Sequence, residues 1–104
     1  MSLSVTDLFS LLGQPARLQI LLALGVGEAC VCHLEALLSL RQASISQHLM
    51  HLRQAGLVFS RRRGRNRFYR LGNPELYEAI CQVAVAGGAQ AQELTHYALR
   101  PVRG

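Results

Sequence analysis

Apolar and polar residues between Gln42 and Leu57 recur with the period of an α-helix. At about 100° per residue, the residues that share one narrow, apolar sector are Ile45, Leu49 and Leu52. A different sector carries short hydroxyls, an amide and two imidazoles, from Ser44, Gln47, His48 and His51. These groups donate and accept hydrogen bonds, and none has the negative charge that would repel a phosphate. The pattern predicts a helix over about 43–55, ended by Gly56, with one packed face and one face open for contact.

The next segment, from Val58 to Leu71, has the pattern of a β-hairpin. Two short runs of aromatic and β-branched residues flank a turn at Gly64, Arg65 and Asn66. A helix with a readable polar face, followed by an arginine-rich hairpin, is typical of a winged helix-turn-helix domain. In such a domain the helix enters the major groove of DNA, and the hairpin, called the wing, contacts the backbone.

Start and stop signals predict further helices on both sides of this unit. Ser4 and Asp7 form a weak capping box, Pro15 suits the first turn of a helix, and Asn73 with Pro74 is a strong start signal. The predicted helices run over about 4–12, 15–24, 35–38 and 74–99, the last with an interruption at two glycines. The chain is therefore expected to be one mainly α domain over 1–104 with a small β-hairpin wing.

The helices over 4–12 and 74–99 carry more apolar surface than a small winged domain needs for its own core. A homodimer would bury this surface. Two wings related by a two-fold axis would then read a pseudo-palindromic site in double-stranded DNA.

The charge distribution also favours a nucleic-acid partner. The formal net charge is +5, and all eleven basic residues are arginine, whose guanidinium group matches phosphate oxygens and guanine edges. No acidic residue lies between Glu35 and Glu75. RNA is disfavoured because the hairpin lacks interleaved exposed aromatics for base stacking. The residues predicted to contact DNA are Arg41, Gln42, Ser44, Ser46, Gln47, His48, His51, Arg61, Arg62, Arg63, Arg65 and Arg67.

The N-terminal segment has no basic start and contains Asp7, so it does not resemble a secretion signal. No apolar run has the length of a membrane span, and no membrane partner is expected. A cytoplasmic location follows as an expectation. The three cysteines would be reduced there, and their odd number argues against a disulfide framework.

The segment Cys30, Val31, Cys32, His33 is the part of the chain with metal-binding chemistry. Thiolates select thiophilic ions, and imidazole is an available further ligand. In a regular helix the two cysteines would point about 200° apart, so they could hold one ion only if the helix start is extended or unwound. Two thiolates are too few for a closed structural zinc site. Cys81, among apolar neighbours, equally suits a buried structural role.

These motifs resemble those of the ArsR/SmtB family of metal- and metalloid-responsive repressors, over about residues 8–85. The resemblance rests on residues 15–21 (Pro-Ala-Arg-Leu-Gln-Ile-Leu), 28–34 (Glu-Ala-Cys-Val-Cys-His-Leu), 44–49 (Ser-Ile-Ser-Gln-His-Leu), 52–58 (Leu-Arg-Gln-Ala-Gly-Leu-Val) and the Arg-Gly-Arg wing that ends with Phe-Tyr-Arg-Leu at 68–71. It implies a dimeric repressor that leaves its operator when arsenite or antimonite, As(III) or Sb(III), binds the thiolates of Cys30 and Cys32. No obligatory cofactor is implied.

Two departures from the family's arsenic motif leave the third ligand open. His33 and Glu35 stand where the family often has an aspartate and a third cysteine. The third donor would be Cys81, His33 or a ligand from solution. Cd(II) or Pb(II) is an alternative inducer, although the N-terminal cysteines usual in such sensors are absent.

A second hypothesis is a repressor of the same fold that responds to persulfide or oxidant through a cysteine pair, with Cys30 or Cys32 joined to Cys81. An enzyme that uses Cys30 with His33 is disfavoured, because no acid is placed to orient the imidazole and no phosphate or cofactor motif accompanies it. The chain is therefore expected not to be an enzyme.

Overall fold

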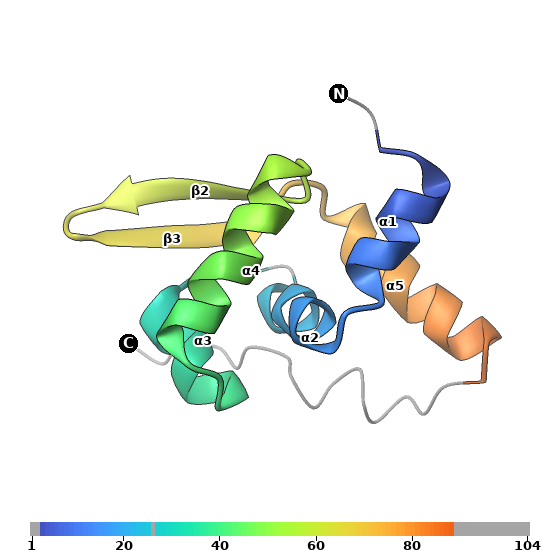
Figure 1. The fold of residues 1–104 in the computed structure, drawn as a ribbon, viewed down its shortest axis with the longest axis horizontal. Helices are drawn as coiled ribbons and strands as arrows, with labels where there is room; N and C mark the ends of the chain where they lie inside the picture. The colour runs from blue at the N-terminus through green and yellow to red at the C-terminus, as the bar shows by residue number, and fades with distance from the viewer. Residues whose placement is uncertain (1–2, 26, 89–104) are drawn as a thin grey trace.

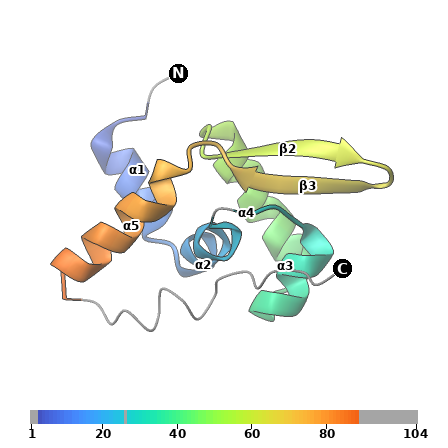
Figure 2. The ribbon, with the colours of Figure 1, turned by 180° about the vertical axis from the view of Figure 1, so that it is seen from behind.

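The computed structural model describes residues 3–25 and 27–88. In chain order these residues form α1 (Val5–Leu12), α2 (Pro15–Leu24), β1 (Ala29–Cys30), α3 (Val31–Leu38), α4 (Gln42–Gln54), β2 (Val58–Arg63), β3 (Asn66–Leu71) and α5 (Glu75–Ala86). Helix α2 lies in the middle, with α3 and α4 on one side and α1 and α5 on the other (Figure 1). The β2–β3 hairpin extends away from the helices, as the view from behind also shows (Figure 2). This is the predicted winged helix-turn-helix.

The capping signals place the starts of α1, α2 and α5 as predicted, within one residue. The Ser4 hydroxyl accepts a hydrogen bond from the backbone N–H of Asp7 at 3.0 Å, and α1 begins at the next residue after Ser4. Asn73 accepts from the N–H of Glu75 at 3.0 Å, so α5 begins at Glu75, directly after Pro74. The predicted continuation over 89–99 lies outside the described residues.

The core is built from α2 and the apolar face of α4. Ile20, Leu21 and Leu24 of α2 are fully buried, and so are Ile45, Leu49 and Leu52 of α4. The narrow sector predicted from the 3.6-residue period is therefore the packed face, and α4 spans 42–54 where 43–55 was expected. Because this face is buried, the opposite face of α4 is held toward solvent.

The sheet contains one strand that the sequence did not predict. Strands β2 and β3 pair antiparallel as expected, and Gly64 takes a left-handed φ of 63° in their tight turn. The third strand is β1, whose Ala29 lies opposite Tyr69 and whose Cys30 lies opposite Phe68 on β3. The predicted short helix over 35–38 is also too short, because α3 begins at Val31, immediately after this strand.

None of the described helices is both long and apolar enough to span a membrane.

Candidate nucleic-acid interface and thiol site

The open face of α4 presents most of the predicted base-reading residues to solvent. Ser46, Gln47 and His51 are exposed, as are Arg41 and Gln42 at the start of the helix. Ser44 is half-buried. The exposed hydroxyl, amide and imidazole groups are the kinds of donors and acceptors that hydrogen-bond to base edges in the major groove.

His48 departs from this pattern, because its ring is half-buried. Its Nδ1 is shielded from solvent and has no hydrogen-bond partner among the described residues, and the same holds for Nε of Arg17 on α2. Burial, and then the nearby positive charges of Arg17 and His51, lower the pKa of His48. The ring is therefore neutral near pH 7 and is less accessible than the exposed Gln47 and His51, with which the helical projection grouped it.

The wing arginines fall into two groups. Arg62, Arg63, Arg65 and Arg67 are exposed. Arg61 instead forms a bidentate ion pair with Glu28, in which its Nε and Nη2 donate to the two carboxylate oxygens at 2.8 Å each. The Arg61 guanidinium holds the pKa of the Glu28 carboxyl below its usual value. Arg61, predicted as a DNA contact, is thus already paired with an acid from outside the basic interval.

Sequence reasoning missed a contact between α4 and the wing. Nη1 of Arg53, in the last turn of α4, and Nη1 of Arg67, on β3, both donate to the hydroxyl of Ser60 on β2, at 3.3 Å and 3.0 Å. The hairpin pattern placed Ser60 and Arg67 on paired strands. Only the packing of α4 against β2 brings Arg53 to the same hydroxyl.

The two cysteines near the start of α3 lie side by side because the chain is extended there. Cys30 has φ −87° and ψ 167°, ends β1 and precedes the first residue of α3, while Cys32 is in the first turn of that helix. Their side chains are hydrogen-bonded to each other. The sequence predicts that the two sulfurs meet only if the start of the helix is extended or unwound. The extended backbone of Cys30 meets this condition.

The two thiols differ in acidity. Burial would raise the pKa of Cys30, but hydrogen bonds from the Cys32 thiol and from the backbone N–H of His33 outweigh it and lower this pKa. The pKa of Cys32 is raised, chiefly because its proton is shared with the Cys30 sulfur. Cys30 is half-buried and Cys32 is exposed. The pair therefore presents one thiolate-prone sulfur and one thiol that donates to it.

The described residues contain no group of three His, Cys, Asp or Glu side chains close enough to hold a metal ion. His33, directly after Cys32, is half-buried. Cys81 belongs to α5, on the far side of α2 from α3 (Figures 1 and 2). There it lies beside Tyr77, whose phenol pKa is raised by burial and by this cysteine. Within this part of the chain, neither candidate joins the cysteine pair.

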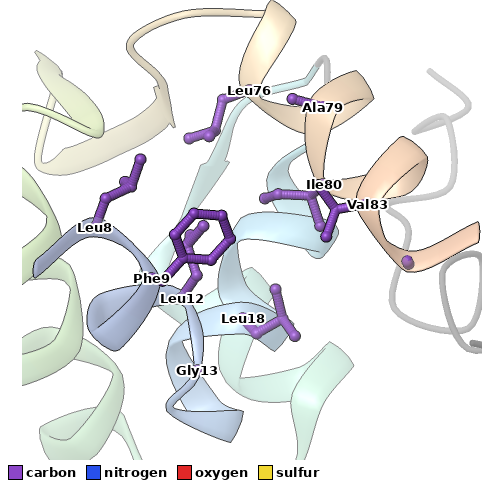
Figure 3. Close-up of a pocket in the computed structure, with 10 residues that line it drawn as sticks. Leu8, Phe9, Leu12, Gly13, Leu18, Leu76, Ala79, Ile80 and Val83 are labelled. Carbon is purple, nitrogen blue, oxygen red and sulfur yellow. The ribbon is translucent and has the colours of Figure 1, made fainter. Parts of the chain in front are cut away.

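An apolar groove of about 350 Å³ lies between α1 and α5, with α2 as its floor (Figure 3). Its lining includes Phe9, Leu12, Leu76, Ile80 and Val83. Phe9 and Val83 remain 53% and 56% exposed, which is unusual for apolar side chains that point toward a common groove.

Comparison with known proteins identifies the family. Residues 14–60, from α2 to the first wing strand, match the family model described as "Bacterial regulatory protein, arsR family". The chain is 40% identical over 96 residues to the arsenic resistance transcriptional regulator ArsR2 of Pseudomonas putida, a match that covers 90% of this chain and 83% of that protein. This chain belongs to the ArsR family. It is a winged helix-turn-helix transcriptional repressor.

Other similar proteins have different functions in their names. The chain is 41% identical over 85 residues to the biofilm growth-associated repressor of Agrobacterium fabrum, a match that covers 79% of this chain and 73% of that protein. Among solved structures, the repressor BigR from Xylella fastidiosa is similar with a TM-score of 0.73 and 32% identity, over 83% of this chain and 88% of that one. A homodimeric winged helix-turn-helix domain from Mycobacterium bovis has a TM-score of 0.72 and 28% identity, over 88% of this chain and 82% of that one.

Proposed function

We propose that this ArsR-family repressor leaves a pseudo-palindromic operator when As(III) or Sb(III) binds the sulfurs of Cys30 and Cys32. The observation that carries the proposal is the contact between the two thiols at the junction of β1 and α3. The relatives named as arsenic resistance regulators support the choice of inducer. We also propose a cytoplasmic location, since such a sensor needs its thiols reduced.

The chemistry needs no change in oxidation state. Arsenite in neutral water is As(OH)₃. Each As–S bond forms as one As–O bond breaks, and the thiol proton leaves with the released hydroxyl as water. Cys30, whose pKa is lowered, would attack first, and Cys32 would close the bridge. Two protein sulfurs leave one position on arsenic, which a hydroxyl kept from arsenite would fill, because neither His33 nor Cys81 joins the pair in the described residues.

The cysteine pair is joined to both DNA-binding elements. Cys30 is paired with Phe68 of the wing strand β3, and α3, which begins one residue later, packs against α4. Since the sulfurs already converge, inducer binding need not unwind a helical turn. A bridge between them would instead fix the β1–α3 junction and change its fit to the wing and to α4.

In the DNA-bound state, exposed Gln47, Ser46 and His51 would read base edges. Arg63 and Arg65, near the wing tip, would contact phosphates. The groove between α1 and α5 would be covered by a second copy of the chain, as the homodimeric relative suggests. The dimer would then present two recognition helices to two half-sites.

The test uses a fluorescent operator duplex, selected from a random-sequence library, under anaerobic conditions with a phosphine reductant. Arsenite should weaken binding by wild type at least about fivefold. Cys32→Ser should bind DNA normally and resist release, and Cys81→Ser is the matched control. Release that persists in Cys32→Ser would remove this residue from the site and overturn the proposal. Loss of release in Cys81→Ser as well would assign the third donor to Cys81.

A second candidate is a thiol switch, favoured by the low pKa of Cys30 beside a second thiol. One similar solved structure is that of reduced HlyU from Vibrio cholerae, with 35% identity and a TM-score of 0.68. A persulfide or an oxidant would release such a repressor, and arsenite in strictly reducing buffer would not. Cd(II) or Pb(II) in the same titration tests the alternative metal inducers.

A further inference from the structure

Two arginines from different DNA-binding elements converge on one serine. Arg53 comes from the last turn of α4 and Arg67 from β3, and both guanidinium groups donate to the Ser60 hydroxyl, at 3.3 Å and 3.0 Å. Both arginines are exposed and Ser60 is half-buried. We call these three residues the Ser60 cluster. It lies where the recognition helix meets the base of the wing.

The charge in this cluster is not balanced by the protein. Across residues 3–25 and 27–88, the one ion pair between side chains joins Arg61 to Glu28, so neither Arg53 nor Arg67 is paired with a carboxylate. Two guanidinium groups that share one neutral hydroxyl repel each other, and an anion bound between them would attract both and offset that repulsion. Ser60 accepts from both arginines through its oxygen, which leaves its own proton for donation to such an anion.

We propose that the Ser60 cluster binds one phosphodiester group of the DNA backbone and so joins the recognition helix to the wing. The proposal rests on the proposed DNA-binding function. A phosphate oxyanion accepts charge-assisted hydrogen bonds from both guanidinium groups. A base edge is a poorer ligand here, because recognition helices contact bases near their N-terminal ends, whereas Arg53 follows all the proposed base-reading residues and lies one residue before the end of α4. The cluster determines how tightly the protein holds DNA and not which sequence it prefers.

The salt dependence of DNA binding tests this site. Log affinity falls with log salt in proportion to the number of phosphates contacted. The double variant Arg53→Gln/Arg67→Gln should flatten this slope by about one unit per protomer, because both arginines share one phosphate. A change near two units would mean two separate phosphates, and no change would mean no contact. Either result overturns the proposal.

Two further variants separate the site from net charge and from misfolding. Ser60→Ala keeps every charge, and it should weaken binding several-fold with the slope unchanged. Arg70→Gln removes one exposed wing charge whose guanidinium lies 5.9 Å from the centre of the Phe59 ring, and it should leave the slope as in wild type. An equal flattening in Arg70→Gln would attribute the effect to net charge and overturn the site. Thermal melting of each variant checks that the fold is intact.

A single uncharged methylphosphonate linkage, moved along the duplex, identifies the phosphate. At one position per half-site it should weaken wild type and have no effect on the double variant. Inorganic phosphate, compared with chloride at equal ionic strength, distinguishes a free ion from DNA. If inorganic phosphate raises the melting temperature of wild type, while wild type and the double variant show the same slope of log DNA affinity against log salt, the cluster binds free phosphate only. That result would overturn the proposal. If wild type binds no duplex at all, the proposed function itself fails.

Discussion

Glu28 and Arg61 are joined by two hydrogen bonds of 2.8 Å, across 33 residues of sequence. Glu28 stands two residues before Cys30, and Arg61 lies opposite Phe68, which is the β3 partner of Cys30. One ion pair therefore ties the segment that leads into the thiol site to the wing. It also neutralises an arginine that the sequence predicts to be a DNA contact.

The first prediction concerns this ion pair. Glu28→Gln should release the Arg61 guanidinium for a DNA phosphate, so the slope of log affinity against log salt should steepen by about one unit per protomer. Arg61→Gln in the otherwise unchanged protein should leave the slope unaltered, since that arginine is already paired. Fluorescence titrations at several salt concentrations measure both. A flatter slope in Arg61→Gln would show that Arg61 contacts DNA despite Glu28.

The second prediction concerns the acidity of Cys30. Its pKa lies below that of an ordinary thiol, so its alkylation by iodoacetamide should reach half-maximal rate at a lower pH than that of Cys32. Cys32→Ala removes a hydrogen bond to the thiolate, and the midpoint for Cys30 should then move to higher pH. Tandem mass spectrometry of the Cys81→Ala protein assigns each label. A lower midpoint for Cys32 than for Cys30 would contradict the assignment.

The elements that carry their own periodic pattern could be predicted from the sequence. The apolar sector of α4 and the two runs of the wing each repeat over enough residues to fix type, face and limits. Strand β1 could not be predicted in this way, since two residues have no period. Its existence depends on Tyr69 and Phe68 of β3, about 40 residues later in the chain.

The candidate site was predictable where it depends on local chemistry and not where it depends on packing. The Cys30–Cys32 pair follows from spacing once the helix start is extended. The lowered pKa of His48 depends on its burial in the fold and on the charge of Arg17 from α2. The pairing of Arg61 depends on an acid that precedes a strand the sequence does not reveal. A run of like charges predicts that a segment lies on the protein surface, whereas the partner of each charged side chain is set by tertiary contacts.

The third prediction tests the orientation of α4. Leu49 is fully buried and its neighbour Met50 is 47% exposed. Leu49→Ala should lower the free energy of unfolding by about 2–5 kcal/mol, because it leaves a cavity in the core. Met50→Ala should change it by less than about 0.5 kcal/mol. Urea unfolding at fixed protein concentration measures both, and equal losses would mean that the packed face of the helix is misassigned.

The fourth prediction concerns the groove between α1 and α5. If a second copy covers this groove, Phe9→Asp would place a carboxylate in an apolar interface, where burial of an unpaired charge is strongly unfavourable. The dissociation constant of the dimer should rise at least about a hundredfold, equivalent to roughly 2.7 kcal/mol. Met50→Asp, which adds the same charge to an exposed position on α4, should leave it unchanged. Sedimentation velocity over a range of concentrations measures both. If each recognition helix reads one half-site, as proposed, the Phe9→Asp protein should also lose most of its affinity for a full operator while it still binds an isolated half-site as wild type does. An unchanged dissociation constant in Phe9→Asp would place the contact between copies on another face.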